Sequence, residues 1–132
     1  MTERTQNQPR LVTCSYRDYR PEMGVPVATS VGRNAHFDHA PEVQALRPFG
    51  VFRTMDDRPL EEQVRAYRHR LHQRRAQIED EFRALAAEYP DVPFVVLCWC
   101  SAEVARRDEC HRRWAAAWFE DLYGHPVPEV RP

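Results

Sequence analysis

The longest hydrophobic pattern in the chain has the period of an α-helix. From residue 60 to residue 89, apolar positions recur at intervals of three, four or seven. They are Leu60, Val64, Tyr67, Leu71, Ile78, Phe82, Leu85 and Tyr89. A straight helix of this length would run roughly 45 Å, against roughly 35 Å for the width of a small domain. We therefore expect it to bend, to split near residues 72–75 or to project toward a partner, with Asp57 as its N-cap and Pro59 in its first turn.

Shorter apolar segments are typical of β-strands. Residues 94–100, FVVLCWC, form an unbroken apolar run, which predicts a central strand buried on both faces. Residues 11–16 predict a second strand, and residues 25–31 predict a further extended segment. The tail PVPEV, residues 126–130, is compatible with an edge strand, where prolines are tolerated. Residues 32–48 are typical of a long irregular connection with one helical turn near its end.

A second helix is predicted after the central strand, beginning at Asp108 and ending before Gly124. Its apolar stripe repeats every four positions, at Cys110, Trp114, Trp118 and Leu122. The order of strands and helices predicts an α/β fold, with a small and mostly parallel sheet, helices packed on it, one long helix and a C-terminal Cys-His-Arg helix. We expect residues 1–10 to be a flexible leader and residues 11–132 to form a single α/β domain.

Composition narrows the class of protein. The 132 residues include 19 basic residues, all arginine, and 20 acidic ones, so the net charge of -1 gives no general attraction to nucleic acid. The chain has 4 glycines, and they form neither a dinucleotide-binding motif nor a P-loop. No apolar run is long enough for a membrane span, and the polar N-terminus is unlike a secretion signal, so we expect a cytoplasmic protein without membrane contact. Its 4 cysteines then indicate thiols, metal ligands or catalytic groups rather than a disulfide framework.

Three of the four cysteines lie between the central strand and the second helix. In an extended strand, Cys98 and Cys100 point to the same face, and they lie at the carboxyl end, where open α/β sheets bind ligands. Cys110, His111 and Arg112 fall in the first helical turn. Backbone N–H groups and the helix dipole favour a bound anion there, and they lower the pKa of a nearby thiol.

The leading interpretation is a site for a phosphate-bearing ligand, either a nucleotide or a nucleic-acid end. Cys110 and Arg112 would hold the anion at the helix start. Tyr16 and Arg17 would line the opposite wall, with Cys98 beneath. Whether such a site is catalytic stays open at this point.

Other chemistries would use the same residues. A zinc site would take the thiolates of Cys98, Cys100 and Cys110 with His111 as fourth ligand. The side chains of adjacent residues on a helix point about 100° apart, which opposes binding of one ion by both Cys110 and His111. In a catalytic site, Cys110 would act as nucleophile and His111 as proton carrier. Cys100 and Arg106 have the spacing of cysteine phosphatases and sulfurtransferases, but the loop between them has no glycine to cradle a phosphate. The cysteines would also fit the core as small apolar residues.

A different kind of function, without catalysis, is binding to another protein. The long helix carries an arginine-rich polar face, which would present a surface to a protein partner, as in a phage-encoded interaction module. Acidic residues flank these arginines at spacings that also allow ion pairs along a solvated helix. Histidines of the connection and of the long helix are expected to face solvent: His36, His39, His69 and His72.

Two blocks of the sequence, residues 13–33 and 97–130, resemble the DUF-488 (domain of unknown function) family. The family pattern has a cysteine at the end of the central strand and a Cys-His-Arg triplet at a helix start, matched here by Cys98, Cys110, His111 and Arg112. Many relatives have an acidic residue where this chain has Cys100. The resemblance implies a small cytosolic α/β protein of bacteria, archaea or phages, and it implies no established activity.

Overall fold

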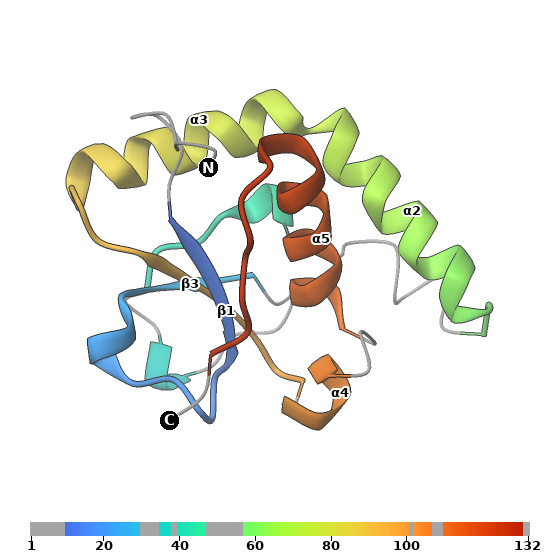
Figure 1. Ribbon diagram of the computed structural model, residues 1–132, viewed down its shortest axis with the longest axis horizontal. Helices are drawn as coiled ribbons and strands as arrows, with labels where there is room; N and C mark the ends of the chain where they lie inside the picture. The colour runs from blue at the N-terminus through green and yellow to red at the C-terminus, as the bar shows by residue number, and fades with distance from the viewer. Residues whose placement is uncertain are drawn as a thin grey trace.

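A three-stranded parallel sheet forms the centre of the molecule (Figure 1). The computed structural model describes residues 10–29, 35–37, 40–46, 57–100, 102–106 and 110–130. Its strands are β1 (Leu11–Ser15), β2 (Val25–Ala28) and β3 (Phe94–Cys98), and their order is β1-β3-β2. The predicted α/β class and the central position of the FVVLC strand are therefore confirmed.

The register of the sheet places the carboxyl ends of its strands at one edge. Ser15 pairs with Cys98, and Ala28 pairs with Leu97. Every residue of β3 is buried, as its unbroken apolar run predicts. The strand is shorter than the predicted 94–100, because the chain bends at Trp99 and Cys100. This bend begins the site described below.

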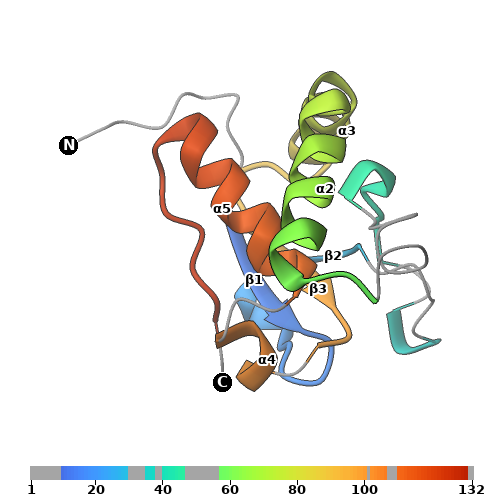
Figure 2. The same cartoon turned by 90° about the vertical axis from the view of Figure 1, so that its right-hand side faces the viewer.

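One face of the sheet is covered by helices (Figure 2). They are α2 (Leu60–Gln73), α3 (Arg75–Glu88) and α5 (His111–Tyr123). Helix α5 packs against β1 and β3, and α2 packs beside α5. Trp114 and Trp118 lie in the core between these layers, so their predicted burial is confirmed.

The long helical pattern is divided into two helices at Arg74, which is one of the three outcomes expected from its length. Figure 1 shows the resulting change of direction between α2 and α3. The predicted N-cap, Asp57, is wrong. Pro59 is the N-cap, because its carbonyl accepts the first bonds of the helix, from the N–H groups of Glu62 and Gln63.

The segment between β3 and α5 contains a short helix that the sequence pattern did not predict, α4 (Ala102–Arg106). Helix α5 begins at His111, and its N-cap is Cys110 rather than Asp108, which lies outside the described residues. Cys110 is extended, and its carbonyl accepts the first backbone bond of the helix from the N–H of Arg113. Gly124 ends α5 with φ 73°, a conformation that glycine adopts without strain, so the predicted stop is confirmed.

The C-terminal segment runs beside β1 and makes a single parallel bridge, between Thr13 and Glu129. The N–H of Thr13 donates to the carbonyl of Pro128 at 2.9 Å, and the N–H of Val130 donates to the carbonyl of Thr13 at 2.8 Å. A longer ladder does not form, since Pro126 and Pro128 have no N–H to donate. This bridge sets Glu129 next to the start of α5.

The other face of the sheet is covered by a thinner layer. Cys14, Val95 and Leu97 are buried there, and Tyr19 and Phe37 pack over them. The short 3-10 helices η1 (Pro21–Met23) and η2 (Ala35–Phe37) occur in this region, whereas η3 (Gln44–Leu46) packs against α3 on the other face. The last of these lies where one helical turn is predicted in the connection. Among the described residues, no helix is both long and apolar enough to cross a bilayer.

Candidate metal centre

Three thiols meet at the carboxyl edge of the sheet. Cys98 is the last residue of β3, Cys100 follows in the bend, and Cys110 is the N-cap of α5. Their Sγ atoms all lie within 4.8 Å of one another. The bend after β3 places Cys100 beside Cys98, and the start of α5 brings Cys110 to meet them.

The thiol cluster, defined here as Cys98, Cys100 and Cys110, differs in exposure from one sulfur to the next. Cys98 is 1% exposed and Cys110 is fully buried, whereas Cys100 is partly exposed. Ala105 of α4 is buried against the cluster, and Val104 packs beside it. The short helix therefore covers two thiols while the third keeps contact with solvent.

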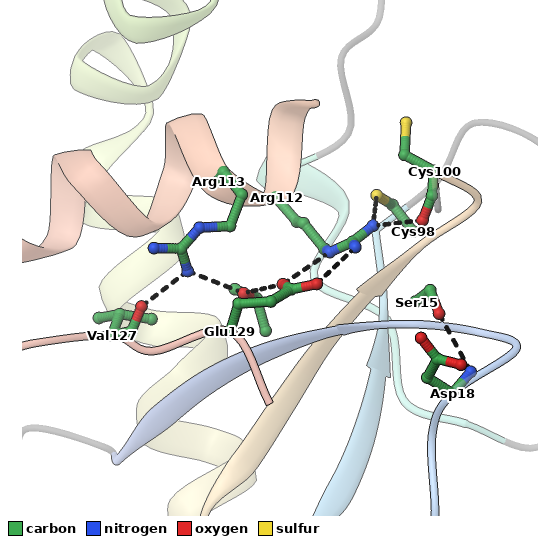
Figure 3. Close-up of polar contacts among 9 residues, drawn as sticks. Ser15, Asp18, Cys98, Cys100, Arg112, Arg113, Val127 and Glu129 are labelled. Carbon is green, nitrogen blue, oxygen red and sulfur yellow. Dashed lines mark hydrogen bonds and ion pairs between the residues drawn. The ribbon is translucent and has the colours of Figure 1, made fainter. Parts of the chain in front are cut away.

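The buried guanidinium of Arg112 lies beside Cys98 and Cys100 (Figure 3). Its Nη1 donates to Cys98 Sγ at 3.0 Å and to the carbonyl oxygen of Cys100 at 2.7 Å. On its other side, Nε and Nη2 donate to the two carboxylate oxygens of Glu129, at 3.0 and 2.7 Å. Burial opposes the charge of Arg112, but the bond to Glu129 and the nearby thiols outweigh it, so the pKa is raised and the side chain stays cationic.

Glu129 is itself held by β1 and by the next arginine. Thr13 donates its hydroxyl to Glu129 Oε1 at 2.6 Å. Arg113 Nη1 donates to Thr13 Oγ1 at 2.9 Å and to the carbonyl of Val127 at 2.8 Å (Figure 3). Arg112 thus connects the C-terminal segment to the thiol cluster, and Arg113 holds the same segment to β1.

His111 is turned to a different partner. Its Nε2 lies 3.0 Å from Thr29 Oγ1, and that hydroxyl is 2.8 Å from the carbonyl oxygen of Leu97. Since the hydroxyl proton goes to the carbonyl, Thr29 accepts a bond from His111, and Nε2 carries the proton. Burial lowers the pKa of His111, so the ring is neutral. The thiol cluster forms without His111, which agrees with the divergence of neighbouring residues on a helix.

The three thiols are not equivalent in acidity. Hydrogen bonds from the thiols of Cys100 and Cys110 hold the pKa of Cys98 well below its usual range, and the charge of Arg112 acts in the same direction. The same bonds, with burial, raise the pKa of Cys110. Cys98 is therefore the most acidic of the three thiols, and Cys100 and Cys110, whose pKa values are raised, are its hydrogen-bond partners.

The structure places the residues of the phosphate hypothesis on two sides of the sheet edge. Cys98, Cys110 and Arg112 lie together, but Arg112 is already bonded to Glu129. Tyr16 belongs to the thinner layer, where its ring packs edge-on against Trp99 at a centroid distance of 5.1 Å. A phosphate bound by Arg112 would compete with the Glu129 carboxylate.

Several other candidate residues lie outside the thiol cluster. Arg17 is exposed in the turn after β1, and His36, His69 and His72 are exposed as predicted. His39 and the side chain of Arg106 are not among the described parts of the chain, so the phosphatase-like pair is not placed.

Sequence reasoning missed Glu129 and Thr13. The sequence pattern predicts an edge strand for the tail and assigns no partner to its single carboxylate. The signal lay in the composition of PVPEV, where one acidic residue stands among prolines and valines. An acidic side chain in such a segment needs a cationic or hydrogen-bonding partner if the segment packs on the sheet.

Comparisons of this chain with protein-family models, with curated proteins and with solved structures find no match. The resemblance to the DUF-488 family stays a prediction. Function is inferred below from the site itself.

Proposed function

We propose that this protein binds a soft divalent metal ion, with zinc as the best fit, through the thiolates of Cys98, Cys100 and Cys110. The observation that carries this proposal is the grouping of three Sγ atoms within 4.8 Å of one another. In a tetrahedral zinc site with Zn–S bonds of about 2.3 Å, neighbouring sulfurs lie roughly 3.8 Å apart. Small side-chain movements would bring the three thiols to that spacing.

The chemistry of the donors favours zinc over harder ions. Thiolates select zinc, copper(I) or iron, whereas magnesium and calcium prefer oxygen ligands. Only cysteine sulfurs belong to the cluster among the described residues. Copper(I) and iron are thus the competing ions, and magnesium and calcium are disfavoured.

The surroundings of the cluster fit a charged metal centre. Three thiolates and one divalent ion carry a net negative charge. The Arg112 cation donates to Cys98 Sγ and also holds the carbonyl of Cys100, while Glu129 fixes the guanidinium in turn. Such outer partners orient the ligands of a metal and tune its affinity.

A site with three protein ligands has consequences for activity. Structural zinc sites are usually closed by four protein ligands, and catalytic ones keep one position for water or substrate. The described residues supply three ligands, and His111, the predicted fourth, is bonded to Thr29. The three thiols would leave a fourth tetrahedral position, which water, substrate or a further ligand would fill.

The first experiment is a metal analysis of protein purified without a histidine tag and without oxygen, followed by titration with cobalt(II). We expect about one equivalent of metal and intense thiolate-to-cobalt absorption that saturates at that ratio, because thiolates must bind the ion directly. A cobalt spectrum with no sulfur-to-metal bands would overturn the proposal.

Cysteine variants make the assignment specific. Cys98→Ser and Cys110→Ser each remove one sulfur ligand and should lose most of the cobalt absorption. Cys14→Ala is the matched control, since Cys14 is also buried but lies in the apolar layer with Val95 and Leu97. Equal loss in all three variants would contradict a site built from the cluster. Binding of a nucleotide by a protein that takes up no metal would favour the phosphate hypothesis instead.

A further inference from the structure

We propose that Cys100 is the reactive thiolate of this centre and that the substrates it accepts are soft alkylating electrophiles. The inference rests on the proposed metal centre and adds a substrate class and a reacting atom to it.

Access to solvent separates Cys100 from its two neighbours. Cys98 is 1% exposed and Cys110 is 0% exposed, so an electrophile cannot reach either sulfur without movement of the chain. Cys100 is partly exposed, and it lies in the bend beyond the end of β3. Of the three sulfurs, it is the one that a molecule in solution can approach.

Hydrogen bonding to Arg112, like exposure to solvent, favours Cys100 over Cys98 as the reactive sulfur. Arg112 Nη1 donates to Cys98 Sγ at 3.0 Å, whereas its bond to Cys100 ends on the backbone oxygen at 2.7 Å. A charge-assisted bond withdraws electron density from the sulfur that accepts it, and a more stabilised thiolate is a weaker nucleophile. The guanidinium therefore lowers the nucleophilicity of the Cys98 sulfur and leaves the Cys100 sulfur more reactive.

The neighbouring residue provides an apolar surface at the same edge of the sheet. Trp99 is 56% exposed although its indole is large and apolar. Its ring is supported by Tyr16 at a centroid distance of 5.1 Å, and Tyr16 packs on Phe37 at 4.9 Å. The rings of Tyr16 and Phe37 belong to the thinner layer, on the other side of the sheet edge from the thiol cluster, so this surface is separate from the approach to Cys100.

The reaction needs no oxidant or reductant. A bound metal ion would keep the Cys100 sulfur deprotonated at neutral pH, so the reaction would need no separate base. The sulfur lone pair forms a bond to the electrophilic carbon, and the bond from that carbon to the leaving group breaks, with the electron pair departing on the leaving group. The product is a thioether on Cys100. It is uncharged and a weaker ligand than a thiolate, so alkylation would weaken the binding of a metal ion.

Alkylation of the zinc-loaded protein with a limiting amount of iodoacetamide tests this inference. Cleavage after arginine places Cys14 in residues 11–17, Cys110 in residues 108–112, and Cys98 with Cys100 in residues 84–106. Fragment ions that separate Cys98 from Cys100 then identify the modified sulfur. We expect Cys100 to react at least about tenfold faster than the other cysteines, because it combines exposure with thiolate character.

Two controls accompany the experiment. Cys100→Ser should remove the fast adduct without making Cys98 or Cys110 fast, and Cys14→Ala should leave the rate at Cys100 unchanged. Protein unfolded in urea with a chelator should react at all four cysteines, which confirms that each peptide is detected.

The outcomes separate this inference from the proposed function. Cobalt absorption that is intact while Cys98 or Cys110 reacts first, or while all three react equally, would overturn the assignment of Cys100 and leave the metal centre standing. Absence of cobalt binding in the same preparation would overturn the proposed function and this inference with it.

Discussion

Cys14 and Cys98 lie on neighbouring strands, almost side by side, and their surroundings give them opposite chemistry. Cys14 pairs with Leu97, and Cys98 is the next residue along β3. Both are almost completely buried. Burial raises the pKa of Cys14 to about 11, with the charges of Glu129 and Asp18 adding to the effect. The pKa of Cys98 is well below its usual range, because two thiols donate to it and Arg112 lies beside it.

The difference shows that burial alone does not decide the state of a thiol. Cys14 lies in the thinner layer, among apolar side chains. Cys98 lies among other sulfurs, under a buried cation. Successive residues of a strand face opposite sides of a sheet, so one step along neighbouring strands is enough to exchange one environment for the other.

The largest loss of stability is expected from removing the Arg112 cation, which lies beside Cys98 and not among the apolar neighbours of Cys14. Arg112→Ala leaves the Glu129 carboxylate without its paired guanidinium, and breaking a buried pair in this way costs about 3–5 kcal/mol. Urea unfolding monitored by circular dichroism, at neutral pH and with a chelator present, measures the free energy of unfolding.

A second variant distinguishes loss of the pair from general damage to the core. Arg112→Met with Glu129→Gln removes both charges and keeps side chains of similar size. We expect it to recover a substantial part of the lost stability, because no unpaired charge remains. A double variant as unstable as Arg112→Ala would show that packing, and not charge, makes Arg112 important.

Removal of the metal should have the next largest effect on stability, and this effect should depend on the thiol cluster and not on Cys14. A ligand present at about 100 times its Kd stabilises the folded state by about 2.7 kcal/mol. Zinc should raise the thermal unfolding temperature of the natural sequence and of Cys14→Ala, and it should leave Cys110→Ser unchanged. Stabilisation of Cys110→Ser to the same extent would place the ion elsewhere.

Cys14 should make stability fall at alkaline pH. Its pKa is about 11 in the folded protein and near 9.0 when unperturbed, so below pH 9.0 the thiol is neutral in both states. As the pH rises between these values, the unfolded chain loses the proton first, and the contribution of the buried neutral thiol is lost. Urea unfolding of metal-free protein at about pH 8 and about pH 10.5 should show a steeper loss for the natural sequence than for Cys14→Ala. Parallel losses would contradict the raised pKa.

The smallest effect is expected from an arginine outside the site, which sets the baseline for Arg112. Arg65 and Glu61 form an ion pair of 3.2 Å on α2, with side chains 74% and 83% exposed. Such pairs contribute at most about 0.5 kcal/mol, because water and salt screen them. Arg65→Ala should therefore unfold at nearly the same urea concentration as the natural sequence. A loss comparable to that of Arg112→Ala would remove the distinction between buried and exposed arginines.

Local patterns predicted the parts of this fold that depend on near neighbours. The unbroken run at 94–98 identified the central strand, since a strand covered on both faces has no polar positions. The two cysteines of CWC were predicted to share a face from the period of a strand. Their sulfurs do meet, but β3 ends at Cys98 and the bend that follows, rather than a strand, brings Cys100 there. The caps were predicted less well, because Pro59 and Cys110, rather than nearby aspartates, take the first positions of their helices.

Spacing over a few residues was enough to predict the central strand, the helical stripes and three cysteines near the strand end. Tertiary structure alone decided which groups surround the thiols. Arg112 meets Glu129 through the tail that packs along β1, and His111 meets Thr29, a residue 82 positions away in the chain. These pairs depend on how distant segments fold back on the sheet, and no local period in the sequence encodes that arrangement.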